Sequence, residues 1–75
     1  MWYNDKIVVR THSKIGTQMC WAIISGVPIT GWIRIKPATP DGVSNVFAIL
    51  CIAQATGRHV DVYIPSGEIE QATLR

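Results

Sequence analysis

The sequence has few charged residues, few aromatic residues and no long apolar run. Charged side chains make up 16% of the 75 residues and aromatic side chains 8%, and the longest unbroken apolar run covers residues 46–53. Because about 20 consecutive apolar residues are needed to span a bilayer, this run argues against a membrane span. With 48% hydrophobic residues, the chain is instead predicted to fold as one compact domain over residues 1–75.

The N-terminal residues show no basic start followed by an apolar stretch, so they do not read as a signal peptide. We therefore expect a secreted or periplasmic protein in its mature form, or a cytoplasmic protein if Met1 is the native start.

The sequence also lacks the usual patterns of catalysis and metal binding. It has no Cys-x-x-Cys pair, and His12 and His59 are far apart without a cluster of other ligands. The acidic residues show no spacing that suggests an acid–base pair, and no Ser or Cys stands in a nucleophile motif. We expect a protein that is not an enzyme and that holds neither a metal nor a cofactor.

A chain of this length buries only about 60–65% of its unfolded surface, so its core needs additional support. Cys20 and Cys51 could form one disulfide in an oxidising compartment. They could equally be two small buried hydrophobic residues, and the sequence leaves both readings open.

Five segments have the patterns of β-strands: residues 6–11, 18–25, 32–36, 59–64 and 68–74. In the first, Ile7 and Val9 share one face. The second is apolar on both faces, which predicts burial on both sides. In the third, Ile33 and Ile35 are expected to point inward.

Residues 42–56 are predicted to form a helix, with Asp41 as N-cap and Gly57 as C-cap. One apolar stripe is predicted to face the core, made of Val43, Val46, Phe47 and Leu50. The opposite side is also largely apolar, with Ala48, Ile49, Ile52 and Ala55. That second face is either buried deeper in the fold or in contact with neighbouring subunits, and we favour the subunit contact because so short a chain has little else to cover it.

Three strands, one helix and two strands, with short links between the first three strands, favour a mainly β fold. The expected architecture is a five-stranded OB-fold-like barrel with one α-helix between the third and fourth strands.

Three stretches of the chain resemble a known family. They are WYNDKIV at residues 2–8, MCWAI at 19–23, and the segment 47–62, where Thr-Gly leads from the helix into a Val-rich strand. Together they resemble the OB-fold B subunits of bacterial A–B pentamer toxins, of the subtilase-cytotoxin and typhoid-toxin type.

This resemblance implies a secreted pentamer that binds cell-surface glycan, with an enzymatic A subunit as a further partner. In these relatives an aromatic residue and a following Ser contact sialylated glycan, and the matching positions are Tyr3 and Asn4. The implied glycan site therefore lies at Trp2, Tyr3, Asn4 and Asp5.

Two other functions are compatible with the sequence. Trp32, Arg34 and Lys36 alternate onto one face, and an aromatic residue among cations suits single-stranded nucleic acid. The net charge of +2 argues against that partner. The remaining alternative is a small secreted interaction protein without a sugar site.

Overall fold

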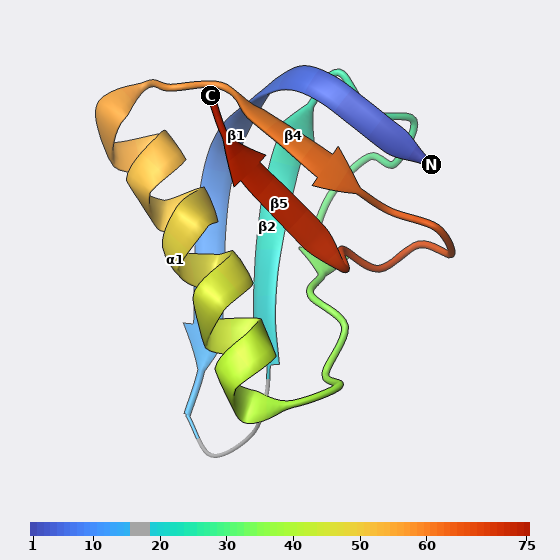
Figure 1. Ribbon diagram of the computed structural model, residues 1–75, viewed down its shortest axis with the longest axis vertical. Helices are drawn as coiled ribbons and strands as arrows, with labels where there is room; N and C mark the ends of the chain where they lie inside the picture. The colour runs from blue at the N-terminus through green and yellow to red at the C-terminus, as the bar shows by residue number, and fades with distance from the viewer. Residues whose placement is uncertain (16–18) are drawn as a thin grey trace.

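The computed structural model describes residues 1–15 and 19–75 and shows a mainly β domain with one helix (Figure 1). The strands β3, β2, β1, β4 and β5 form one five-stranded sheet in that order, and each neighbouring pair is antiparallel. The elements are β1 (Trp2–Lys14), β2 (Met19–Ser25), β3 (Ile33–Arg34), α1 (Pro40–Thr56), β4 (Val60–Tyr63) and β5 (Gln71–Leu74). The predicted mainly β fold, with its helix between the third and fourth strands, is confirmed.

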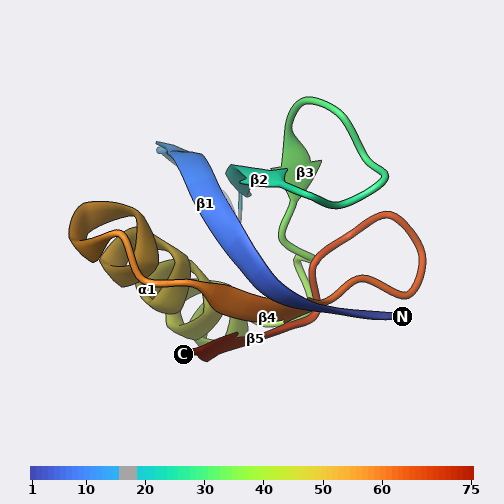
Figure 2. The same ribbon diagram turned by 90° about the horizontal axis from the view of Figure 1, so that it is seen from above.

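β1 belongs to both halves of the sheet. Its first residues, from Trp2 to Lys6, pair with β4, and the remainder pairs with β2. Figure 2 shows β1 crossing from the β4–β5 side to the β2–β3 side. The register shifts twice along this strand, once in each half, and such bulges bend and twist a strand locally.

The first strand contributes Val8 to the core, while its neighbours Ile7 and Val9 stay exposed. Val8 is buried opposite Ile24, whereas Ile7 and Val9 are 48% and 47% exposed. The prediction placed Ile7 and Val9 together on one face and said nothing of Val8. The bulge between Val8 and Arg10 leaves Val9 as the extra residue, so simple alternation fails there.

The core forms where the curved sheet packs against α1. Its members are Val8, Ala22, Ile24, Ile33, Ile35, Val43, Leu50, Ala53, Val60, Val62, Ile64 and Ile69. The inward positions of Ile33 and Ile35 are therefore confirmed. In β2, only the face with Ala22 and Ile24 is buried, and the opposite face is half-buried, so the prediction of burial on both sides was wrong. Gln18, the predicted first residue of that strand, lies outside the described residues.

The segments that follow β3 and precede β5 meet at one isolated bridge among the described residues. Ile35 and Ile69 form an isolated parallel bridge, in which the Ile69 N–H donates to the Arg34 carbonyl (2.9 Å). The Lys36 N–H donates to the Ile69 carbonyl (3.0 Å). One bridge is not a continuous ladder, so closure into a barrel stays a prediction. The third and last strands are also shorter than the predicted segments 32–36 and 68–74.

The helix begins earlier than predicted. Its N-cap is Thr39, whose Oγ1 accepts a hydrogen bond from the Gly42 N–H (3.0 Å), so the assignment of Asp41 as N-cap was wrong. Pro40 suits the first helical position, where its missing N–H costs nothing, and Asp41 stands in the first turn. Gly57 closes the helix in the left-handed conformation (φ 72°), as predicted.

α1 packs one face on the sheet and leaves the other exposed. Val43, Leu50 and Ala53 are buried. On the predicted second face, Ala48, Ile52 and Ala55 are exposed and Ile49 is half-buried. The single chain therefore does not bury this apolar face. Within the described residues, the structure contains no helix with the length and hydrophobicity that crossing a membrane requires.

Candidate functional site

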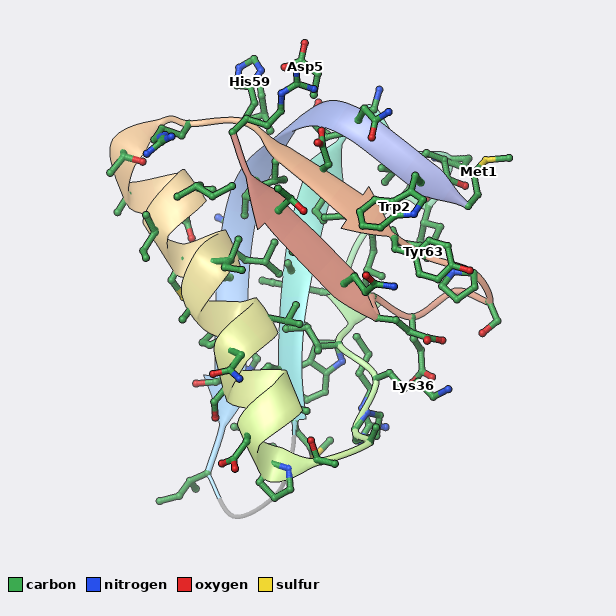
Figure 3. The ribbon with its side chains drawn as sticks, viewed as in Figure 1. Met1, Trp2, Asp5, Lys36, His59 and Tyr63 are labelled. Carbon is green, nitrogen blue, oxygen red and sulfur yellow. The ribbon has the colours of Figure 1, made fainter. Side chains whose placement is uncertain are left out.

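Trp2 and Tyr63 form an aromatic pair at the outer face of β1 and β4. They are direct cross-strand partners, with ring centroids 5.3 Å apart and planes tilted by 38°. Trp2 is 44% exposed and Tyr63 is half-buried (Figure 3). The site thus presents an aromatic surface that its own packing holds in place.

Tyr3 points to the other side of the sheet. It pairs with Val62, which is fully buried, and its ring packs against the core. Because successive residues of a strand face opposite sides, only one of the two N-terminal aromatic residues can lie outward. The structure gives that position to Trp2, although the resemblance pointed to Tyr3.

The bulge in the first half of β1 lies at Asn4 and Asp5, beside the aromatic pair. One residue of β4, Asp61, lies between the partners of Tyr3 and Lys6, whereas two residues of β1 lie between Tyr3 and Lys6 themselves, so β1 holds one extra residue here. Asp5 adopts a left-handed backbone (φ 59°), a conformation in which Asp is among the more tolerant residues. Both Asn4 and Asp5 are exposed. The bulge turns their side chains outward instead of pairing them into the ladder.

Asp5 joins a polar network with β4 and the C-terminus. Its carboxylate lies 2.6 Å from His59 Nδ1, and its N–H donates to Asp61 Oδ1 (2.9 Å). Arg75 Nη1 donates to the same Asp61 oxygen (3.0 Å), and Arg58 Nε donates to the Arg75 carbonyl (2.7 Å). Figure 3 shows His59 and Asp5 side by side at this edge.

The hydrogen bond with His59 and the positive charges of His59, Arg75 and Lys6 lower the pKa of Asp5 below 3.8, against a smaller effect of burial. The Asp5 and His59 side chains are 62% and 43% exposed. Because both side chains are exposed, their oxygens and nitrogens remain accessible to a ligand.

The outer face of β5 extends the same surface. Gln71 pairs with Tyr63 and Thr73 pairs with Asp61, and both polar side chains are exposed. Cross-strand partners lie about 5 Å apart. The aromatic pair is therefore flanked by a row of hydrogen-bonding groups. An aromatic face beside such groups is suited to a sugar, which has a C–H face and a rim of hydroxyls.

The structure separates the three residues of the alternative binding face. Trp32 is exposed and lies 5.7 Å from the ring of His12, whereas Lys36 pairs with Glu70 (Nζ–Oε2 3.4 Å). Lys36 lines a cavity of about 300 Å³ between the start of α1 and Ile69, and Trp32 does not line that cavity. Arg34 lies beside another aromatic residue, Trp21, which is its cross-strand partner.

Two residues that the sequence reading did not assign, His12 and Trp21, complete an aromatic cluster with Trp32. The three side chains line a cavity of about 250 Å³. The only sequence signal for this cluster would have been the register between the first two strands, which places His12 opposite Trp21.

Cys20 and Cys51 are both free thiols and both half-buried. Partial burial and the neighbouring Cys51 raise the pKa of Cys20. The two thiols lie on α1 and β2, which are in contact, and a disulfide between them stays a prediction. Among the described residues there is no group of three or more His, Cys, Asp or Glu side chains placed to hold a metal ion.

Comparison of the chain with protein-family models, with curated proteins and with solved structures found no match.

Proposed function

We propose that this protein is a saccharide-binding subunit of a homo-oligomer, similar to the OB-fold B subunits of pentameric toxins. The observation that carries the proposal is the exposed Trp2–Tyr63 pair, set in a row of hydrogen-bonding side chains. Trp2 offers its ring to the C–H face of a sugar. Asn4, Asp61, Gln71 and Thr73 supply donors and acceptors for its hydroxyls.

The strand connections support an OB-like barrel. The order β3-β2-β1-β4-β5, with the helix between β3 and β4, is the order of a five-stranded Greek-key barrel opened between β3 and β5. The parallel bridge between Ile35 and Ile69 lies where such a barrel would close. The two bulges of β1 bend the strand and so favour the same curvature.

The exposed face of α1 supports the oligomer. Ile52 is 48% exposed, and the alanines that flank it, Ala48 and Ala55, leave room for another helix to approach. Contacts of this kind close into a ring when they are repeated around a rotation axis. In the proposed pentamer the helices face one another around the centre. A protein that binds cell-surface sugar in this way would act after secretion.

A glycan array tests the sugar site. We expect the wild-type protein to bind a defined subset of glycans and the Trp2→Ala variant to lose that binding while keeping its circular dichroism spectrum. Trp32→Ala is the matched control, because it removes an exposed Trp on the other half of the sheet. A flat array with wild-type protein, or equal loss in both variants, would contradict the proposal.

Native mass spectrometry tests the oligomer. We expect a discrete species of about five times 8.3 kDa. Ile52→Glu should shift it to monomer without loss of secondary structure, whereas Ile7→Glu, a matched change at an exposed isoleucine of the sheet, should leave the assembly intact. A wild-type monomer at high concentration would rule out the ring.

A further inference from the structure

We infer that the aromatic cluster His12–Trp21–Trp32 and the cations around it form a second binding site, for a short segment of single-stranded nucleic acid. This site uses none of the residues assigned above to sugar binding. It lies on the outer face of β3, β2 and the second half of β1, away from Trp2 and Tyr63.

The pairing of the strands places the cluster on one face. Thr11 pairs with buried Ala22, so the neighbouring pair, His12 and Trp21, faces the opposite side of the sheet. The His12 ring lies 5.4 Å from Trp21 and 5.7 Å from Trp32. The three rings are tilted, by 39° and 56°, and surround a cavity of about 250 Å³.

This cavity is open and Trp32 is 46% exposed, so an aromatic face is available to a ligand. A base can stack on such a face whatever its identity, because every base has a flat π surface.

Cations surround the rings on the same face. Arg10 and Lys14 face outward from β1 on either side of His12, opposite Ile23 and Met19. Four residues of strand place them about 13 Å apart. That separation is wider than a single aromatic ring, so one small anion could not contact both cations. A chain that carries a negative charge on each of several units could contact both.

Arg34 adds a third cation beside Trp21. It is half-buried, and within the described part of the chain its Nε is buried without a hydrogen-bond partner. An unpaired donor of this kind is unfavourable until an acceptor reaches it. The remainder of this half-buried side chain is the third cation that a phosphate can meet on this face.

The charge distribution argues against a cationic ligand for this cluster, although aromatic cages often bind ammonium groups. Residues 6–36, which include the three rings and the three cations of this face, contain no acidic side chain. The net charge of +2 therefore understates the positive charge of this face.

The experiment combines fluorine NMR with salt-dependent binding. The protein labelled with 5-fluorotryptophan has one resonance for each of its three tryptophans, which Trp→Phe variants assign. We expect oligo(dT) to shift the Trp21 and Trp32 resonances and to leave Trp2 unchanged. A shift at Trp2 alone, or no shift, would overturn the inference. Failure of the sugar-binding proposal would be seen in a separate titration with glycan, in which the Trp2 resonance would not shift.

Fluorescence anisotropy with labelled oligo(dT) then measures the phosphate contacts. Three contacts predict a slope of log K against log salt of about −2, since each contributes about −0.7 on a single strand. Arg34→Gln and Arg10→Gln should each reduce the slope by about 0.7, and Trp32→Ala should lower affinity at least about fivefold. Lys36→Gln is the charge-matched control and should change neither value.

Two results would show that the face does not select nucleic acid. In the first, Lys36→Gln reduces the slope of log K against log salt as much as Arg34→Gln does. The other is equal or tighter binding of heparin with the same Trp21 and Trp32 shifts, which would assign the face to sulfated polysaccharide.

Discussion

Gln54 of α1 hydrogen-bonds to β1 at a bulge and again just after it. Its Nε2 donates to the Val9 carbonyl (3.3 Å), and its Oε1 accepts from the Thr11 hydroxyl (2.6 Å). Val9 is the extra residue of the bulge, so its carbonyl lacks a regular place in the ladder. The helix thus fixes the strand where the sheet bends between its two halves.

Replacing Gln54 with Ala should therefore destabilise the protein by about 1 kcal/mol, because two hydrogen bonds are lost at an exposed position. Urea denaturation measures the change. Thr11→Val removes one of the two bonds, and the double variant should cost less than the sum of the singles. Strict additivity would show that the two side chains do not interact.

The helix cap offers a second comparison. Thr39→Ala removes the oxygen that accepts from the Gly42 N–H and should cost about 1 kcal/mol. Asp41→Ala, two residues further on, removes only a favourable charge in the first turn and should cost about 0.5 kcal/mol or less. Thermal unfolding of both variants tests the order, and a larger loss from Asp41→Ala would restore Asp41 as the cap.

The Asp5–His59 pair predicts a pH dependence of stability. Because the folded-state pKa of Asp5 lies below 3.8, its contribution is present above pH 3.8 and is lost as the pH falls through the folded-state value. The unfolded state then binds the proton more readily than the folded state. Asp5→Asn should remove this part of the acid sensitivity, and His59→Asn should reduce it.

Unfolding by urea at several values between about pH 5 and pH 2.5 measures that dependence. The wild-type protein should lose more stability over this range than Asp5→Asn does. If the two curves run parallel, the Asp5–His59 hydrogen bond does not persist in solution.

The two cysteines predict the result of oxidation. Because Cys20 and Cys51 are free thiols on β2 and α1, which are in contact, a mild oxidant should form an intrachain disulfide and remove two hydrogens from the mass. Stability should rise by about 3–4 kcal/mol, as expected for a loop of this length. Cys51→Ser should stay unchanged under the same treatment. Disulfide-linked dimers without intrachain product would show that β2 and α1 hold the thiols apart.

Most of the strands and the helix could be read from the sequence, because their signals are local. Val60, Val62 and Ile64 alternate without interruption in the predicted strand 59–64, and all three are buried. Gly57 follows the last helical residue in the conformation that glycine adopts most readily. One error falls where an extra residue changes the face, at Val9 in the second half of β1, and the others concern the N-cap of the helix and the second face of β2.

The candidate site could be predicted only in part from the sequence. Trp2, Asn4 and Asp5 were expected near a ligand, and their positions at the N-terminal end of β1 agree with a surface site. Tyr63, Asp61 and His59 were not assigned to it, since they are far from Trp2 in the sequence. Nothing in local composition indicates that β4 rather than another strand will lie beside β1.

The sequence by itself determined the elements of this protein. Hydrophobic periodicity, turn residues and caps act between residues that are close in the sequence, so their effect can be predicted without knowing the tertiary structure. Only the tertiary structure decided which side chains meet. The Trp2–Tyr63 pair, the Asp5–His59 hydrogen bond and the His12–Trp21–Trp32 cluster all depend on strand register. That register is set by burial of the whole core and by two bulges in β1, and a shift of one residue would turn each of these side chains to the other face.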